Sequence, residues 1–159
     1  MNTPILRVYA DTSVFGGAFD EEFEEASQSF FDMIRRGRFH LLTSVVLQEE
    51  IEPAPAEVQE LFEEMLNFAE IVDVSETALQ LQRAYLDAEI VTEKWATDAL
   101  HVALATVTGC SMIVSWNFKH IVHFRKIPLY NAVNTLSGYS NIAIYSPQEV
   151  IDYEEDKDI

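Results

Sequence analysis

The most continuous apolar pattern of the chain lies between Lys94 and Gly109, where small and apolar residues recur at helical spacing on almost every face. A helix that is apolar nearly all round is normally buried. Asp98 lies near the start of this predicted helix, and His101 follows one turn later on the same face. A carboxylate in such a helix is costly unless it is paired, capped or bound to a cation. The pattern therefore predicts a partner for Asp98.

The rest of the chain alternates short apolar runs with longer amphipathic stretches. Runs that predict strands lie at residues 6–10, 39–43, 69–74, 111–115 and 142–145. Predicted helices occupy residues 19–36, 45–51, 56–68, 76–88, 94–108 and 129–136, with a loose loop at Gly16-Gly17 and a basic loop or short helix at 118–126. Because strands alternate with helices throughout, the pattern predicts an α/β fold, a parallel sheet with helices on both faces. Such sheets bind ligands beyond the carboxyl ends of their strands, near the topological switch point.

Capping residues mark several of these boundaries. Ser44 and Ser75 are placed to cap the helices that follow them, and Ser146 with Glu149 forms a capping box. Residues 1–152 are expected to form one domain, followed by an acidic, solvated tail at residues 153–159.

Composition narrows the class of protein. One cysteine, Cys110, excludes an internal disulfide framework and a cysteine-based zinc cluster, and it fits a reducing compartment. Neither a signal peptide nor an apolar run approaching the ~18 residues of a membrane span is present, so we expect a cytoplasmic protein without a membrane partner. The net charge of −17 disfavours non-specific adhesion to nucleic acid, and it weighs against a nucleic-acid enzyme unless metal ions and a local basic patch offset the repulsion.

Four polar side chains are predicted to converge at the carboxyl edge of the sheet. Asp11 and Asn117 follow the first and fourth strands, while Glu50 and Asp98 lie in early turns of helices that reach the same edge. Carboxylates brought together repel one another, and a hard divalent cation makes the arrangement tolerable. Oxygen ligands favour Mg²⁺ or Mn²⁺. An ion at this edge would support phosphodiester hydrolysis.

Each of these residues also has a plain structural interpretation. Asp11 with Thr12 and Ser13 forms a sequence that is typical of a turn. Glu50 stands beside Glu49 and Glu52 on what is by default an acidic helix surface. For Asp98 a functional role is favoured over a structural one, because its helix offers little surface to solvent.

The histidines and lysines near these acids are equally open to two interpretations. His101 is more often a hydrogen-bonded core histidine than a metal ligand, so we expect it to support the acids rather than to bind an ion. Lys119 and His120, with the basic residues up to Lys126, form either a phosphate-contacting patch or a solvated basic loop.

The order of these motifs resembles PIN-domain proteins, a group that includes the VapC toxins of bacterial toxin–antitoxin pairs. The resemblance rests on four segments and extends to the closing capping box; the segments are Asp11-Thr-Ser, Ser44-Val-Val-Leu-Gln-Glu-Glu50, Asp98-Ala-Leu-His and Ser115-Trp-Asn117. It implies a three-layer α/β/α fold with a five-stranded parallel sheet and Mg²⁺-dependent ribonuclease activity on RNA. It also implies a homodimer and a small antitoxin protein as partner.

Carried over by position, the resemblance assigns the metal ligands to Asp11, Glu50 and Asp98. Glu50 is preferred to Glu49 because it lies six residues after Ser44, where the motif places its glutamate. Asn117 departs from the family, which mostly has Asp there, although a subgroup with Trp-Asn and a later His-Ile is similar to this chain. Asn117 keeps a carbonyl oxygen for the metal or its water shell but removes one negative charge, which weakens the case for a second ion.

Two other functions are compatible with parts of the sequence. A phosphatase with an aspartyl nucleophile would need a second Asp two positions after Asp11, where this chain has Ser13. A PIN scaffold that binds RNA or a protein partner without cutting is favoured by Asn117 and by the net charge.

Overall fold

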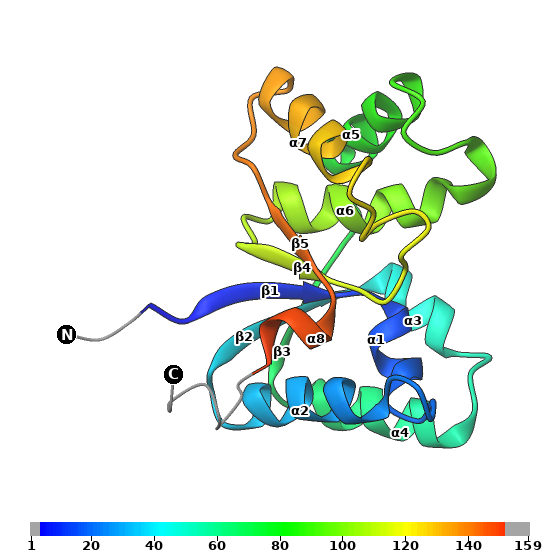
Figure 1. Ribbon diagram of the computed structural model, residues 1–159, viewed down its shortest axis with the longest axis vertical. Helices are drawn as coiled ribbons and strands as arrows, with labels where there is room; N and C mark the ends of the chain where they lie inside the picture. The colour runs from blue at the N-terminus through cyan, green and yellow to red at the C-terminus, as the bar shows by residue number, and fades with distance from the viewer. Residues whose placement is uncertain (1–3, 152–159) are drawn as a thin grey trace.

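A computed structural model describes residues 4–151, and five parallel strands form its centre (Figure 1). The strands are β1 (Leu6–Ala10), β2 (Phe39–Ser44), β3 (Ala69–Val72), β4 (Met112–Val114) and β5 (Ala143–Tyr145). They form one sheet in the order β3-β2-β1-β4-β5, and every neighbouring pair is parallel. The predicted α/β class and the five-stranded parallel sheet are confirmed.

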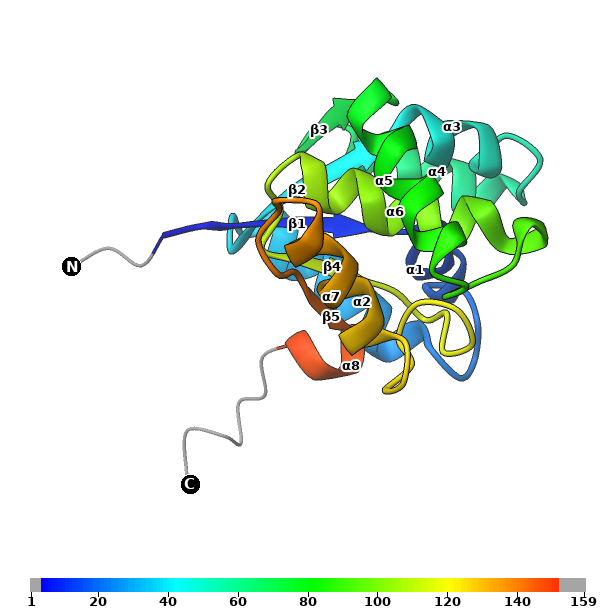
Figure 2. The same ribbon diagram turned by 90° about the horizontal axis from the view of Figure 1, so that it is seen from above.

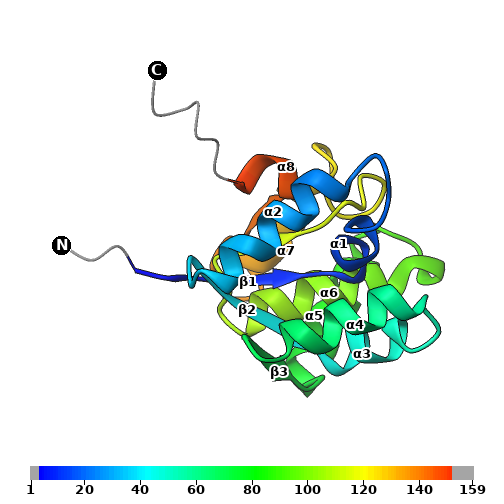
Figure 3. The same cartoon turned by 90° about the horizontal axis from the view of Figure 1, so that it is seen from below.

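Helices cover both faces of this sheet. Two helices, α2 (Glu24–Arg35) and α4 (Ala56–Met65), lie below it in Figure 1 and in front of it in Figure 3. On the other face, seen from above in Figure 2, lie α5 (Glu76–Asp87), α6 (Ala96–Val107) and α7 (Ile127–Leu136). The short helices are α1 (Thr12–Gly17), α3 (Val45–Ile51), the 3-10 helix η1 (Glu93–Trp95) and α8 (Pro147–Val150). The arrangement is the predicted three-layer sandwich.

The strand order places a topological switch point between β1 and β4. The chain proceeds from β1 outward to β2 and β3, and then crosses back to add β4 and β5 on the other side of β1. The crossover helices therefore lie on opposite faces for the two halves of the sheet. Connections diverge at the carboxyl ends of β1 and β4, where such sheets bind their ligands.

The predicted helix caps form as the sequence indicates. The Ser44 hydroxyl accepts a hydrogen bond from the Leu47 N–H, and Ser75 does the same for Ala78. Ser146 and Glu149 form the reciprocal capping box. Gly109 has a φ of 77°, the left-handed conformation that glycine adopts at little cost, and it ends α6 as predicted.

Several predicted boundaries differ from the structure, chiefly after β1. Gly16 and Gly17 belong to α1 rather than to a loose loop, and the next helix begins at residue 24 instead of 19. A Cβ at residue 17 would lie 2.7 Å from Trp116 Nε1 and 2.9 Å from Ser27 Oγ. This glycine is therefore required by close packing between α1, α2 and the segment after β4, which local sequence does not indicate.

Smaller differences concern helix ends and the basic segment. The fourth helix ends at residue 65 rather than 68, and residues 118–126 form turns without a helix. Among the described residues, no helix is long and apolar enough to cross a membrane. The proposed acidic tail at 153–159 and the domain boundary at residue 152 lie outside the described residues.

The packing of Gly17 generates a first prediction. Gly17→Ala should lower the free energy of unfolding by about 1–3 kcal/mol, the usual cost of overpacking a tight contact. The added methyl group would push Trp116 away from Ser27, whose hydroxyl lies 2.7 Å from the indole N–H. Urea denaturation of the two proteins measures the difference.

Gly16→Ala is the matched control for this prediction. No atom lies within 4 Å of a Cβ at residue 16, and the position is exposed and helical. Alanine should therefore leave stability unchanged or raise it by up to about 1 kcal/mol. Equal losses of unfolding free energy in both variants would contradict this explanation. They would show that α1 tolerates no side chain at either position, whether or not Trp116 is in contact with it.

Candidate functional site

Asp11 is a buried carboxylate at the carboxyl end of β1, only 4% exposed. Its two oxygens accept hydrogen bonds from the hydroxyls of Ser13 (2.5 Å) and Ser115 (2.8 Å). Neither partner carries a positive charge. Burial raises the pKa of the Asp11 carboxyl, and nearby His101 and the two hydroxyls only partly oppose this effect. Asp11 is therefore held firmly in place while its charge stays poorly compensated.

The same hydroxyls fix the chain segment that leaves β4. The Ser13 Oγ accepts a hydrogen bond from the Trp116 N–H, and the Ser115 Oγ accepts one from the Asn117 N–H, both at 2.8 Å. Asp11, the first turn of α1 and the segment after β4 thus form one hydrogen-bonded unit across the switch point.

Glu50 reaches the same edge from α3. Its Oε1 lies 2.6 Å from His101 Nε2 and accepts a hydrogen bond of 2.8 Å from the Thr12 hydroxyl. Partial burial opposes ionisation of Glu50, but the interactions with His101 and Thr12 outweigh it and lower the pKa of this carboxyl. Glu50 is therefore the one of the three acids whose surroundings favour its charge.

A buried hydrogen-bonded chain holds His101 in position behind Glu50. His101 Nδ1 lies 2.6 Å from the Tyr9 hydroxyl, which lies 2.8 Å from Ser44 Oγ. Burial raises the pKa of Tyr9 well above its ordinary value, so the phenol stays neutral. The chain joins α6, β1 and the N-terminus of α3, and it holds the His101 ring against Glu50.

Asp98 lies in the first turn of α6 and is partly buried. Burial raises the pKa of its carboxyl, and a side-chain hydrogen bond with Asn117 and the nearby His120 and His101 oppose the shift. Asn117 is thus one partner that the apolar helix pattern led us to expect.

The geometry gives the carbonyl oxygen of Asn117 a use that we did not expect. This oxygen accepts hydrogen bonds from the backbone N–H groups of Lys119 (3.2 Å) and His120 (2.9 Å). With both lone pairs engaged in that turn, the amide NH₂ is the group that donates to Asp98. The side chain of Asn117 therefore links Asp98 to the following turn.

Asp98 interacts electrostatically with each of the other two predicted acids. The charge of Asp98 contributes to the raised pKa of Asp11, and the charge of Glu50 contributes to that of Asp98. A set of carboxylate oxygens with excess negative charge is chemically suited to a hard divalent cation. Within residues 4–151, however, no three His, Cys, Asp or Glu side chains are already spaced as ligands of one ion. The site has the donors for a cation, with Asp11 and Glu50 each engaged by neighbouring hydrogen bonds.

The other predicted residues take different positions. Thr12 and Ser13 contact Glu50 and Asp11 directly. His120 is buried, stacks on Trp95 with ring centroids 4.3 Å apart, and has no hydrogen-bond partner for either ring nitrogen among the described residues. Lys119 is exposed, with its ammonium 5.5 Å from the centre of the Trp95 ring.

Three contributors to this site escaped the sequence analysis: Tyr9, Ser115 and Trp95. Tyr9 was recognised only as part of the first strand, and Ser115 only as the last residue of the fourth strand and the start of the segment Ser115-Trp-Asn117. Their position next to Asp11 and Asn117 at the ends of paired strands was the available signal, because parallel neighbours share one edge.

Comparisons with known proteins agree with this architecture. A family model described as PIN domain matches residues 7–119. The crystal structure of VapBC2 from Rickettsia felis, bound to a DNA fragment from their promoter, superposes with a TM-score of 0.58 at 15% identity, covering 89% of this chain and 98% of that one. The crystal structure of FitAcB from Neisseria gonorrhoeae superposes with a TM-score of 0.56 at 13% identity, covering 90% of this chain and 99% of that one. At such identities these structures show a shared fold, and no curated protein matches the chain.

The opposite surroundings of Asp98 and Glu50 predict opposite effects on stability in chelating buffer. The raised pKa of Asp98 means that ionisation destabilises the fold, so this cost grows as pH rises above about 4 through the raised pKa. The lowered pKa of Glu50 means that its stabilising contribution is present at neutral pH and is lost as pH falls through that pKa.

At pH 7 without divalent ions, Asp98→Asn should therefore raise Tm and Glu50→Gln should lower it. Shifts of about 2–4 °C are expected, the size that about 1 kcal/mol produces in a domain of this length. Thermal melts between pH 4 and 8 provide the measurement. Shifts of the same sign in both variants would contradict the electrostatic description of the site.

Proposed function

The chain belongs to the PIN-domain family, whose members are nucleases, and from this premise we propose that it is a ribonuclease dependent on Mg²⁺ or Mn²⁺. Asp11, Glu50 and Asp98 hold the ion in this proposal, and Asn117 orients Asp98. The observation that carries it is the meeting of three carboxylates at the switch point, where burial, and to a smaller extent repulsion by a neighbouring carboxylate, disfavours the charge of Asp11 and Asp98. A bound divalent cation would relieve that repulsion.

Each acid is prepared for this role by the residues around it. The Ser13 and Ser115 hydroxyls keep the Asp11 carboxylate in one orientation. His101, supported by Tyr9, keeps Glu50 ionised and pointed at the edge of the sheet. Such fixed positions lower the cost of arranging the site at the moment of reaction.

Asp11, Glu50 and Asp98 would hold a divalent cation, which when bound would supply an activated water and would neutralise charge that develops on the scissile phosphate. The chain's own part is to place the acids and to hold their protonation states. Asp11 and Asp98 lie at the ends of neighbouring elements around the switch point, while Glu50 approaches from α3. This geometry supports attack on a phosphodiester that lies across the carboxyl edge of the sheet.

The proposal extends to a biological setting, the toxin of a toxin–antitoxin pair. A small antitoxin protein and a second copy of the chain are the partners in that proposal. Support comes from the fold shared with VapBC2 and FitAcB over about nine-tenths of the chain.

The two rival functions receive different support. A phosphatase with an aspartyl nucleophile gains none, because the hydroxyl of Ser13, in place of a second acid, is bonded to Asp11 and to the backbone of Trp116. A protein that binds without cutting remains the second candidate, favoured by the amide of Asn117 where most of the family has an acid. Weak Mn²⁺ binding would distinguish it.

Cleavage of a mixed set of structured and single-stranded RNAs tests the proposal. The parent protein should cut in Mg²⁺ or Mn²⁺ and stop in chelator, and both Asp98→Asn and Glu50→Gln should slow cutting by at least about a hundredfold, as loss of charge at a catalytic metal site does.

Glu49→Gln is the matched control, because the same change then falls on the exposed neighbour of Glu50 in the same helix. It should cut at the parental rate. An Asp98→Asn protein that cuts as fast as the parent would refute the assignment. No cutting by any protein, together with undetectable Mn²⁺ binding by titration, would favour the binding function.

A further inference from the structure

The buried hydrogen-bonded chain behind Glu50 links the three parts of the fold that carry the predicted acids. Each of its other members stands a few residues from one acid in the sequence; the pairs are Tyr9 and Asp11 at the end of β1, Ser44 and Glu50 on α3 and its cap, and His101 and Asp98 on α6. The chain therefore touches every element on which the proposed metal site depends.

The members of this chain are closed to solvent. Tyr9 and Ser44 are 0% exposed and His101 is 2% exposed. A buried proton donor that finds no acceptor costs the fold the full desolvation of that group. Each proton of the chain must therefore have an acceptor, and this requirement decides which atom donates at each contact.

The contact between His101 and Glu50 fixes the first donor. Partial burial alone would raise the pKa of Glu50, but its contacts with His101 and Thr12 lower it, so the carboxylate is ionised and can only accept. His101 Nε2, which lies 2.6 Å from Glu50 Oε1, must then carry a proton and donate it. The open question is whether Nδ1 of the same ring carries a second proton.

The far end of the chain answers this question. If Nδ1 of His101 carried a proton, the Tyr9 oxygen would accept it and the Tyr9 O–H would donate to Ser44. The proton of the Ser44 hydroxyl would then have no acceptor, because within residues 4–151 its other contact is the Leu47 N–H, itself a donor. A second charge would also be buried beside Glu50.

With Nδ1 unprotonated, every proton of the chain has an acceptor. The donors then run in one direction: the Ser44 O–H donates to Tyr9, the Tyr9 O–H donates to Nδ1 of His101, and the Nε2–H of His101 donates to Glu50. The Ser44 oxygen still accepts from the Leu47 N–H as the cap of α3. The partner of one ring nitrogen thus selects the proton on the other.

This chain is suited to positioning rather than to proton transfer. Its inner end is the backbone N–H of Leu47, a fully buried residue, so no source or sink of protons lies there. At its outer end, the His101 and Thr12 hydrogen bonds both go to Oε1 of Glu50. Among the described residues none goes to Oε2, which this orientation leaves for a cation.

We propose that Tyr9 is a positioning residue for the metal site, because its hydroxyl holds His101 in the one tautomer that fixes Glu50 by Oε1. The inference rests on the proposed metal-dependent function, and it gives a role to a buried residue of β1 that touches neither ion nor substrate. Loss of a group that orients a metal ligand from behind typically lowers metal affinity 10–100-fold.

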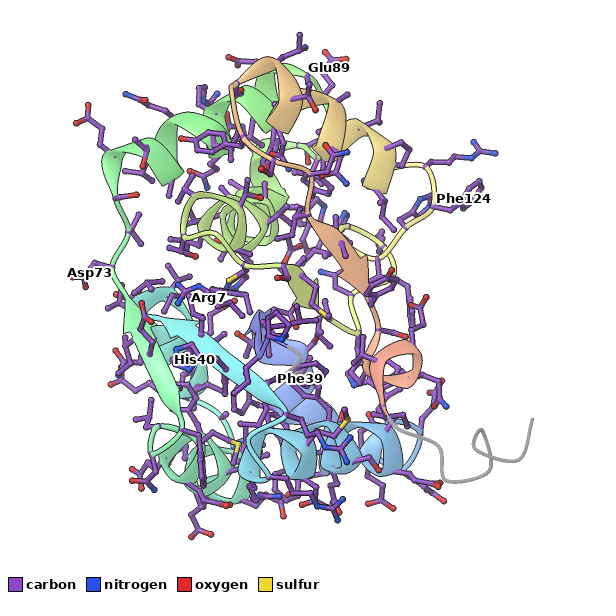
Figure 4. The ribbon with its side chains drawn as sticks, turned by 90° about the vertical axis from the view of Figure 1, so that its left-hand side faces the viewer. Arg7, Phe39, His40, Asp73, Glu89 and Phe124 are labelled. Atoms are coloured by element: carbon purple, nitrogen blue, oxygen red, sulfur yellow. The ribbon has the colours of Figure 1, made fainter. Side chains whose placement is uncertain are left out.

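The tautomer of His101 provides the first test, on the metal-free wild-type chain. Long-range proton–nitrogen NMR correlation at neutral pH should show a proton on Nε2 and none on Nδ1. His40 is the internal reference, since its side chain is 44% exposed and its Nε2 lies 3.3 Å from Glu70 Oε1. Figure 4 shows His40 on the side where the strands begin, and solvent there should average its two nitrogens.

Mn²⁺ titration of Tyr9→Phe provides the second test. The substitution removes one oxygen and keeps the buried ring, so Mn²⁺ affinity should fall by about tenfold or more. RNA cleavage should need correspondingly more Mn²⁺ and should recover when the ion is saturating, because the ligands themselves are intact.

Tyr85→Phe is the matched control for this titration. Tyr85 is equally buried, and its hydroxyl donates to Asn134 between α5 and α7. Its variant should lose stability to a similar extent and should bind Mn²⁺ like the wild-type chain. General loosening of the core would instead weaken Mn²⁺ binding in both variants.

The other outcomes overturn the inference separately from the proposed function. A proton on Nδ1 of His101 refutes the direction of the chain, and this measurement stands even where Tyr9→Phe fails to fold. Equal Mn²⁺ affinities of Tyr9→Phe and Tyr85→Phe refute the positioning role, while a wild-type chain that still cuts RNA keeps the proposed function. A wild-type chain that neither binds Mn²⁺ nor cuts RNA refutes that function and, with it, any role of Tyr9 at a metal site.

Discussion

Burial of two carboxylates, Asp11 and Asp98, beside a third, Glu50, at one edge of a parallel sheet is the constraint around which this site is built. The sheet order β3-β2-β1-β4-β5 brings Asp11 to the switch point, and α6 and α3 bring Asp98 and Glu50 to the same edge. Burial makes the charge of Asp11 still more costly. Carboxyl groups with perturbed pKa values gather at functional sites, so this cost is an argument that the carboxyl edge of the sheet is functional.

The polar residues around the acids determine how far the charge of each carboxylate is stabilised. Hydroxyls, rather than cations, contact Asp11, and they orient its carboxylate without neutralising it. Glu50 is treated differently, because His101 and Thr12 stabilise its charge. The buried hydrogen-bonded chain through Tyr9 and Ser44 connects α6 to α3. The positions of the acids on these helices therefore depend on how the layers of the fold pack.

Asn117 links the acids to the segment at residues 118–126. Its amide donates to Asp98 while its carbonyl closes the turn that starts this segment. An aspartate at this position would bring a fourth negative charge and no donor for Asp98. The asparagine thus gives order to the turn that follows β4 while it contacts Asp98.

Local sequence determined much of this molecule. Alternation of strands and helices gave the α/β class, and the N-cap serines and Gly109 marked element ends, because these signals act over a few residues. Asp98 was identifiable in the same way, since a carboxylate in an all-apolar helix is conspicuous without any coordinates. Long-range packing decided the rest. Gly17 is confined by residues on two other segments, and Tyr9 meets His101 across 92 positions of the chain. Neither contact leaves a periodic trace in the sequence, because each forms only when the layers of the sandwich close on one another.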